Sequence, residues 1–361
     1  MADRGENEFP VFACSEALSG ESGSTGLLLQ QNMWEVVPLL GYGIVEQQGT
    51  QNPEEDETTC RTLTTEDLIS EELLLPQSEE TQQTALIPES VEATAGTALS
   101  NFRPAVQQVQ IDRTQLADYE TLVRNFYAID ANTMAGSDQL SVEKLLGMDM
   151  TLPQEGDGPQ ILIYHTHSQE AFADSVPGDV NTGIVGVGQC LTKILTEQYG
   201  YRVLHHTGQY DVETRDNAYS RALPAVEQIL AENPSIQVII DLHRDEVAEE
   251  TKLVTDIQGR PTARFMFFNG LSRTRKTGDI DYLANENQEA NLAFSFQMQL
   301  KAAEYYPGLT RRIYLKGYRY NMHLRPRTLL VELGAQNNTV EEAINACDPL
   351  AHILDMVLKG E

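Results

Sequence analysis

The stretch 161-ILIYHTHSQEAF-172 decides how this chain folds. Residues 161–164 are consecutive β-branched, aliphatic and aromatic residues, the composition of a buried strand. His165, His167 and Glu170 follow directly. In open α/β sheets, sites are built at the carboxyl ends of the strands. The stretch therefore predicts a buried strand that ends either in a metal site or in a polar turn.

The rest of the C-terminal part alternates between short apolar runs and helical periods. A lead-in element with helical periodicity covers residues 105–150. Further strands are predicted at 201–206, 236–243, 263–270, 310–317 and 327–334, and helices at 182–198, 214–232, 285–305 and 339–358. Pro224 should kink the second of these helices or divide it in two. This order predicts an α/β fold, a mostly parallel twisted sheet with helices on both faces.

Three of the predicted strands end in chemically active residues. His167 and Glu170 follow the first, His243 lies in "VIIDLHRDE", and Glu332 lies in "TLLVELG". A carboxylate between Leu and Val on a central strand is costly to bury without a partner. Two imidazoles with one carboxylate form a catalytic zinc set, and a further carboxylate can serve as general base. We therefore expect Zn²⁺ at this edge of the sheet.

The two histidines of "HTH" compete for the ligand role. His167 forms an HxxE pair with Glu170, which favours it as the ligand. Two residues apart on a strand, His165 should point to the same side and bond a ligand or substrate from the second shell. The opposite assignment, with His165 as the ligand, stays open.

The N-terminal hundred residues differ sharply in charge from the rest. They contain 19 acidic residues but only Arg4 and Arg61, within a chain of formal net charge −29. Their low apolar content predicts a mostly disordered acidic tether over 1–104 and a catalytic domain over 105–361. The acidity argues against nucleic acid as a partner. No apolar run is long enough to span a membrane, and "MADRGENEFP" lacks the pattern of a signal peptide.

Four motifs, "ILIYHTHSQEAF", "IIDLHRDE", "YRYN" and "TLLVELGAQNNTVEEA", occur in this order over about residues 105–358. Together they resemble stage II sporulation protein P, a zinc-dependent cell-wall hydrolase of endospore-forming bacteria. That family belongs to the wider group of zinc N-acetylmuramoyl-L-alanine amidases. The resemblance implies a zinc-amidase-like fold in which His167, Glu170 and His243 bind metal and Glu332 is the catalytic base. His165, Arg244, Tyr320 and Asn321 are the candidates for hydrogen bonds to the metal ligands or to the substrate.

The resemblance also implies a biological setting. The substrate is peptidoglycan, cleaved at the amide between N-acetylmuramic acid and the stem peptide and also at peptide cross-links. The expected partners are stage II sporulation proteins D and M, during engulfment. The expected location is outside the cytoplasm, tethered to the mother-cell membrane at the septum, although no anchor is visible in this sequence.

Two other functions fit the same residues. A metallocarboxypeptidase-like peptidase shares the HxxE, the later His and the late Glu, and needs an arginine for the terminal carboxylate. Arg244, Arg319 and Arg325 are candidates for that clamp. A non-catalytic wall-binding scaffold would be favoured by a missing ligand, and none is missing from the sequence.

Overall fold

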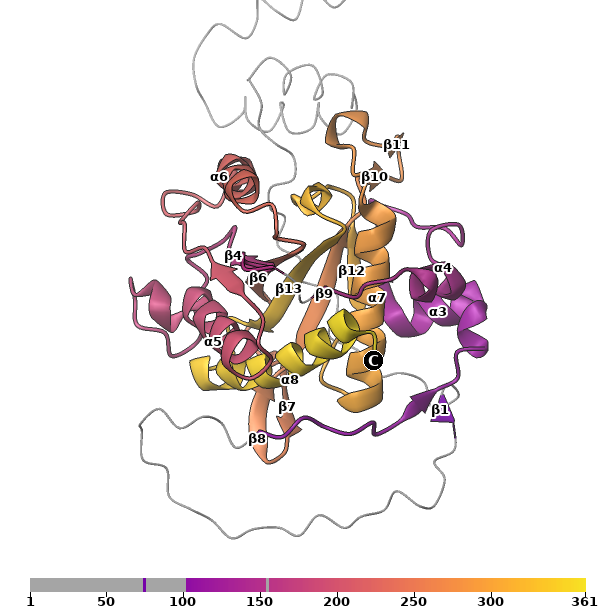
Figure 1. Cartoon of the computed structure of the whole chain (residues 1–361), viewed down its shortest axis with the longest axis horizontal. Helices are drawn as coiled ribbons and strands as arrows, with labels where there is room; N and C mark the ends of the chain where they lie inside the picture. The colour runs from indigo at the N-terminus through magenta and orange to yellow at the C-terminus, as the bar shows by residue number, and fades with distance from the viewer. Residues whose placement is uncertain (1–73, 76–101, 154–155) are drawn as a thin grey trace, which may run out of the picture. The chain divides into compact units, whose positions relative to one another are not determined.

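A mixed sheet of seven strands, in the order β3-β12-β9-β13-β6-β4-β5, forms the centre of the fold (Figure 1). The computed structural model describes residues 74–75, 102–153 and 156–361. The predicted disordered tether falls almost entirely outside these residues. Within them, no helix is both long and apolar enough to cross a membrane.

The strands of the main sheet are β3 (Tyr127–Ile129), β4 (Ile161–Tyr164), β5 (Val203–His205), β6 (Val238–Asp245), β9 (Phe265–Gly270), β12 (Ile313–Lys316) and β13 (Arg327–Ala335). The helices are α3 (Tyr119–Phe126), α4 (Val142–Gly147), α5 (Ile184–Glu197), α6 (Ala218–Glu232), α7 (Gln288–Tyr305) and α8 (Val340–Lys359). Short two-stranded pairs join β1 (Leu74–Leu75) to β2 (Gln110–Ile111), β7 (Val254–Ile257) to β8 (Arg260–Ala263), and β10 (Arg273–Thr274) to β11 (Gly278–Asp279). Single 3-10 turns occupy Gln115–Ala117, Val180–Thr182, Asp281–Leu283 and Met322–Leu324.

The predicted mostly parallel sheet is confirmed, with one reversal. β5, β4, β6 and β13 are parallel neighbours, and so are β3, β12 and β9. The two groups meet where β13 runs antiparallel to β9. The carboxyl ends of β4, β6 and β13 therefore share one edge, whereas β9 and β12 begin near that edge.

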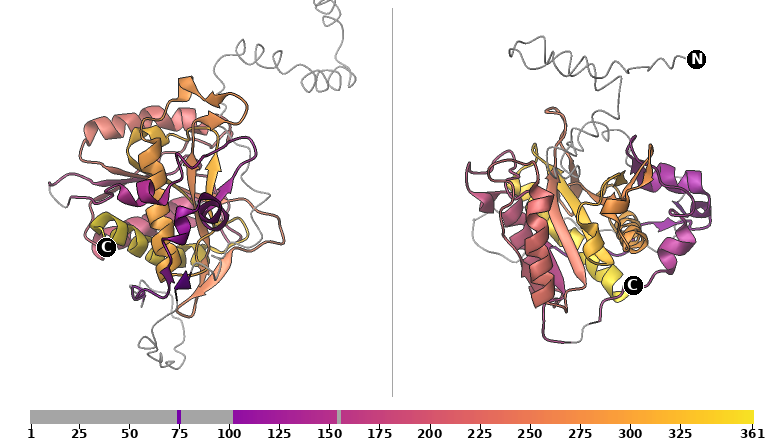
Figure 2. Two further views of the ribbon diagram at one scale, coloured as in Figure 1. Left: turned by 90° about the vertical axis from the view of Figure 1, so that its right-hand side faces the viewer. Right: turned by 90° about the horizontal axis from the view of Figure 1, so that it is seen from above.

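The two faces of the sheet are covered differently. Alternate strand residues such as Ile163, Ile240 and Val331 pack in one core with α5, α7 and α8, which can be followed in Figure 2 by their colours from rose to yellow. On the other face, α6 packs over β4, β5 and β6, through Leu162, Leu204 and Ile239 (Figure 1). The rest of that face, on β13, β9 and β12, packs against the turn that contains Met322. Helices thus lie on both faces, as predicted, and only the first turn of α6, through Tyr219, reaches the part of the face that the Met322 turn covers.

Four details differ from the predicted elements. β6 continues to Asp245, so that His243 lies within the strand and not at its last residue. The β7–β8 hairpin and the short strand β3 were not predicted, because each is too short to show a clear period. The helix predicted from residue 214 begins at Ala218. It runs unbroken through Pro224, so the alternative in which proline divides it is wrong.

The closing helix α8 is nearly all buried, and its first turn is fixed by a capping box. Thr339 Oγ1 accepts a hydrogen bond from the Glu342 backbone N–H at 3.2 Å. The Glu342 carboxylate accepts one from the Thr339 backbone N–H at 3.0 Å. Both bonds satisfy backbone donors that the helix itself leaves unpaired.

We predict that Thr339→Ala lowers the free energy of unfolding by about 1 kcal/mol, because it removes one capping acceptor. Thr339→Ser, which keeps the hydroxyl, should lose only a few tenths of that value. Urea denaturation followed by circular dichroism measures both variants. Equal losses in the two would show that the lost methyl packing, and not the cap, is responsible.

Candidate functional site

A pocket lies beside the shared carboxyl ends of β4, β6 and β13, on the face that α6 covers. It is lined by His167, Glu170, Arg215, Tyr219, His243, Arg244, Asp245, Glu246, Phe268, Lys316, Tyr320, Leu330 and Glu332. Six of the eight residues predicted from the sequence are in this set. His165 and Asn321 are not.

Strand pairing brings His243 and Glu332 together. β13 pairs with β6 so that Glu332 is directly opposite His243, and the two side chains share one face of the sheet. Glu332 is 8% exposed and His243 2%. The imidazole and the carboxylate are therefore held by the backbone of two central strands, which are among the stiffest supports that a fold offers.

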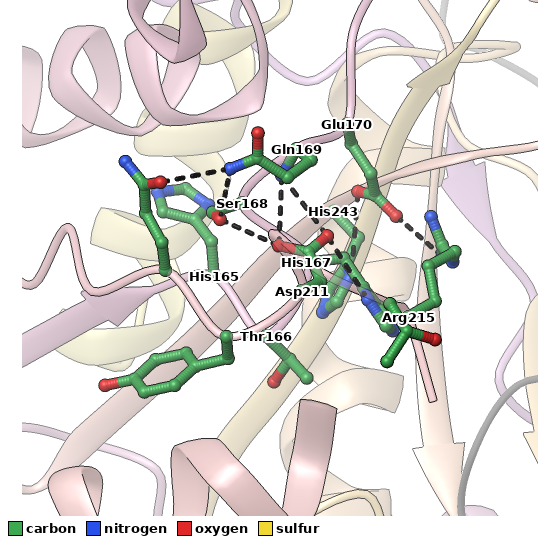
Figure 3. A network of polar contacts seen from close by, with 12 residues as sticks. His165, Thr166, His167, Ser168, Gln169, Glu170, Asp211, Arg215 and His243 are labelled. Carbon is green, nitrogen blue, oxygen red and sulfur yellow. Dashed lines mark hydrogen bonds and ion pairs between the residues drawn. The ribbon is translucent and has the colours of Figure 1, made fainter. Parts of the chain in front are cut away.

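The loop after β4 supplies the second imidazole and the second carboxylate (Figure 3). Thr166 donates from its backbone N–H and its hydroxyl to the carboxylate of Asp241, at 2.9 and 2.7 Å, and this fixes the turn. The His167 ring then lies 5.3 Å from the His243 ring between centroids. Glu170 Oε2 lies 3.6 Å from His243 Nδ1.

His165 lies on the opposite side of the chain from His167. Its Nδ1 lies 2.7 Å from the Leu242 carbonyl oxygen, and its Nε2 lies 2.9 Å from His205 Nε2. A methyl group at Gly188 of α5 would collide with this ring, which shows that it faces α5 and not the pocket. The expectation that the two histidines share a side is wrong, because β4 ends at Tyr164 and the alternation of a strand stops there. Burial, followed by the neighbouring His205, lowers the pKa of His165 to about 4.

Four residues at the site were given no role from the sequence. Asp241 Oδ1 lies 2.8 Å from His243 Nε2, and Asp211 Oδ2 lies 3.6 Å from His167 Nδ1. Arg215 Nη2 donates to Glu170 Oε1 at 3.1 Å (Figure 3). Tyr219, in the first turn of α6, stacks on the His243 ring with 6.3 Å between centroids. Only Asp241 had a local signal, because it is two residues before His243 on the same strand face.

The loop that carries "YRYN" closes another side of the pocket. Tyr320 and Asn321 both have left-handed backbone angles, with φ of +49° and +52°. Asn321 donates from Nδ2 to the Tyr219 carbonyl oxygen at 3.1 Å, and the Tyr320 ring meets the Tyr219 ring edge-on at 5.2 Å. Asn321 therefore acts on the pocket through α6, whereas Tyr320 lines it.

Arg244 approaches the site mainly through its backbone. Its N–H donates to Glu170 Oε2 at 2.8 Å, while its guanidinium donates to the carbonyl oxygen of Ala171 at 3.0 Å. The side chain is thus engaged at the pocket edge by main-chain oxygens.

The two carboxylates have opposite electrostatic settings. Burial alone would raise the pKa of Glu170, but His243, Arg244 and Arg215 outweigh it and hold that pKa well below its usual value. Burial raises the pKa of Glu332 to about 8, and its Oε2 has no hydrogen-bond partner among the described residues. One carboxylate is therefore held ionised, and the other can exchange a proton near neutral pH.

His243 lies between two carboxylates. Burial would lower its pKa, but Asp241 and Glu170 outweigh burial and raise it well above the usual value. In the absence of another cation, the pair of acids thus favours a positive charge on this ring. Within the described ranges, no group of three or more His, Cys, Asp or Glu side chains is already close enough to hold a metal ion.

The fold and the site define a class of protein, an α/β protein with a buried cluster of histidines and carboxylates at the carboxyl ends of adjacent strands. Residues 48–355 match the family described as Stage II sporulation protein P, and the chain belongs to this family. The Stage II sporulation protein P of Bacillus subtilis (strain 168) is 26% identical over 217 residues, which cover 55% of this chain and 51% of that protein. The chain thus spans about half the length of this curated relative.

The solved structures that this chain matches include N-acetylmuramoyl-L-alanine amidases. The N-acetylmuramyl-L-alanine amidase Ami1 from Mycobacterium smegmatis matches at 13% identity over 57% of this chain and 100% of that chain, with a TM-score of 0.35. The CwlD amidase from Clostridioides difficile, solved in complex with the GerS lipoprotein, matches at 12% identity over 56% of this chain and 95% of that chain, with a TM-score of 0.33. At these identities and TM-scores the likeness assigns no function to this chain.

We predict that Glu332→Gln stabilises the metal-free protein. The folded-state pKa of about 8 lies above the usual value near 4.5, so the buried carboxylate lowers stability at pH values above 4.5, increasingly up to pH 8. Removing the charge should raise the free energy of unfolding by roughly 1–3 kcal/mol at pH 7.5. Chemical denaturation with a chelator present measures the change.

The gain should shrink at pH 5.5, where the acid is closer to being protonated in both states. A gain that is the same at both pH values would mean that packing, and not charge, separates the two proteins.

Proposed function

We propose that this protein is a zinc-dependent peptidoglycan hydrolase that cleaves the amide between N-acetylmuramic acid and L-alanine. The observation that carries the proposal is the convergence of His167, Glu170, His243 and Glu332 on one pocket. Membership of the stage II sporulation protein P family supports peptidoglycan as the substrate. Cleavage of stem-peptide cross-links by the same pocket is part of the proposal.

His167, Glu170 and His243 are the residues that would hold zinc. Two imidazoles and a carboxylate form a catalytic zinc set with one open position. His243 Nδ1 and Glu170 Oε2 are 3.6 Å apart, close to the roughly 3.3 Å between two ligands of a tetrahedral ion with bonds of about 2 Å. The chemistry of the three donors and the spacing of this pair therefore fit zinc.

Neighbouring acids orient the two rings. Asp241 faces His243 Nε2, so Nδ1 is the nitrogen directed at Glu170. Asp211 faces His167 Nδ1, which leaves Nε2 for a ligand role. Carboxylates in this position fix the ring and make the other nitrogen a better donor.

When bound, zinc would supply Lewis-acid activation of water and of the scissile carbonyl. Glu332 would accept the proton of the attacking water and pass it to the leaving amide nitrogen. Its raised pKa suits this exchange, since a base works best when its pKa is near the working pH. Glu170, held ionised by His243 and Arg215, is unsuited to carry that proton.

The arginines do not favour the peptidase alternative. Arg319 donates to the Ala284 carbonyl oxygen and Arg325 to that of Ile236, and neither lines the pocket. Arg244 lines it, but its guanidinium is engaged by Ala171. A scaffold without catalysis is likewise not favoured, because the proposed ligands and base are all present.

The proposal also covers which part of the chain is active, where the protein works and with which partners. Residues 105–361 would carry it, and the acidic residues 1–104 would act as a tether. The protein would work outside the cytoplasm, at the septal membrane of the mother cell, with stage II sporulation proteins D and M as partners. Family membership supports this setting.

We predict about one zinc per chain in the purified protein, measured by elemental analysis after dialysis. His243→Ala and His167→Ala should each remove most of it, since each deletes a ligand. His165→Ala is the matched control and should retain zinc, because that ring is committed to Leu242 and His205. A larger loss in His165→Ala than in His167→Ala would contradict the assignment.

We predict that Glu332→Gln keeps its zinc and loses turnover of muropeptides by about 10²–10⁴, the usual worth of a positioned acid–base group. Products are identified by mass, with and without a zinc chelator. Glu304→Gln is the control, since Glu304 is also buried with a raised pKa but lies on α7, outside the pocket.

Loss of zinc together with activity in Glu332→Gln would make Glu332 a ligand instead. Near-normal turnover would make it a structural carboxylate. If the products show that only the terminal residue of the peptide is removed, the protein is a carboxypeptidase-like peptidase and not an amidase.

A further inference from the structure

Tyr219 lies against both histidines that are proposed to bind zinc, but the proposed chemistry gives its hydroxyl group no role. Its ring stacks on the His243 ring with 6.3 Å between centroids and meets the His167 ring edge-on at 5.7 Å. Since the two imidazole centroids are 5.3 Å apart, the three rings form a triangle with nearly equal sides. A substrate carbonyl held beside the two imidazoles therefore also lies beside Tyr219.

The first turn of α6 and the turn above it hold the Tyr219 ring in place. Side chains of a helix tilt toward its N-terminus, so this ring points back toward the loop that carries Arg215. The Tyr219 carbonyl oxygen accepts a hydrogen bond from Asn321 at 3.1 Å, and the ring meets the Tyr320 ring edge-on at 5.2 Å. These contacts use the backbone and the ring, so none of them needs the hydroxyl.

The hydroxyl group is available to a substrate. Within the part of the chain that the structure describes, it makes no hydrogen bond. Its oxygen also keeps contact with solvent, unlike the hydroxyl oxygens of Tyr127 and Tyr164, which are fully buried. Tyr219 lines the pocket, so the pocket is the space that this oxygen meets. A tyrosine that is only 4% exposed usually has a hydrogen-bond partner for its hydroxyl, and here the partner expected is a ligand.

Hydrolysis of an amide creates a charge that such a donor stabilises. The oxygen of the attacking water bonds to the carbonyl carbon, and an electron pair of the C=O double bond moves onto the carbonyl oxygen. When the C–N bond breaks, this pair returns to the double bond, and the nitrogen leaves with the proton that Glu332 carried. A phenol keeps its own proton at neutral pH, because its usual pKa is about 10. It therefore donates a hydrogen bond to the negative oxygen without giving up the proton.

We propose that the Tyr219 hydroxyl donates a hydrogen bond to the carbonyl oxygen of the cleaved amide and stabilises the negative charge that develops there. The inference rests on the proposed hydrolase function and adds a catalytic residue to it. Glu332 lies beside His243 on the neighbouring strand, whereas Tyr219 stacks on the face of the same ring. Glu332 transfers the proton, and Tyr219 stabilises the oxygen.

The first test removes only the hydroxyl from the full chain. Tyr219→Phe keeps the ring contacts with both histidines, so its zinc content and its midpoint of urea unfolding should match wild type. Its kcat on muropeptides should fall about 10²-fold, the usual worth of one such donor, whereas KM should change little. The matched control is Tyr314→Phe, which should leave kcat unchanged. Tyr314 belongs to the same apolar cluster, but its hydroxyl bonds Asp130 at 2.9 Å, outside the pocket.

A binding measurement tests the contact with the oxygen without turnover. The probe is a muropeptide in which a phosphinate replaces the cleaved amide, because this tetrahedral anion resembles the charged state of the reaction. In calorimetry, Tyr219→Phe should bind the phosphinate about tenfold more weakly than wild type, the usual worth of a hydrogen bond to a charged group. Affinity for the intact muropeptide, measured in the Glu332→Gln protein with and without Tyr219→Phe, should be nearly the same.

The results separate this inference from the proposed function. Wild-type kcat and phosphinate affinity in Tyr219→Phe would overturn the inference and leave the hydrolase in place. Equal losses of affinity for the phosphinate and the intact muropeptide, or a loss of zinc or of stability, would also overturn it, because the hydroxyl would then act on general binding or on folding. A wild-type protein that binds the phosphinate through Tyr219 but cleaves no muropeptide would overturn the hydrolase and keep the donor. Neither binding nor turnover in wild type would overturn both.

Discussion

The register of β13 between β6 and β9 is the constraint on which the site depends. It sets Glu332 beside His243 on one side and beside Met266 on the other. Because strand side chains alternate, a slip of one residue would turn Glu332 into the core with α7 and α8 and bring Leu333 into the pocket. The hydrophobic alternation of Leu329, Val331 and Leu333 against that core resists such a slip. Packing of the core on one face of the sheet therefore fixes the position of Glu332 on the other face.

Two buried carboxylates, Glu170 and Glu332, differ in pKa because their polar neighbours differ. Glu170 accepts from the Arg244 backbone and from Arg215, and it lies beside His243, so its charged form is stabilised. Glu332 has burial without a matching set of donors, so its neutral form is favoured. A pair of acids separated in this way is what acid–base chemistry at neutral pH requires. The stability that the large core of the sheet provides offsets the free-energy cost of burying Glu332.

The reversal between β13 and β9 widens the site beyond the strand ends. In a wholly parallel sheet, the side chains of the site would all lie at the one edge where the strands end. Here β9 and β12 also contribute to the pocket, through Phe268 and Lys316, and Tyr219, Tyr320 and Met322 pack over this part of the sheet face. The Tyr320–Asn321 turn, with its left-handed backbone, closes that surface against α6.

The sequence by itself determined the α/β class, the helices and all strands of the main sheet except β3, and the convergence of three strand ends. Those features follow from local composition and period, as in Ile161–Tyr164 and in the buried Glu332 of "LLVELG". Only the tertiary structure decided that His165 turns toward α5, because the end of β4 at Tyr164 depends on its neighbours. It alone brought Asp211, Arg215 and Tyr219 to the histidines, and it alone reversed β9 against β13. Such contacts join residues far apart in the chain, and no local pattern encodes them, since strand direction and loop path are fixed by packing across the whole sheet.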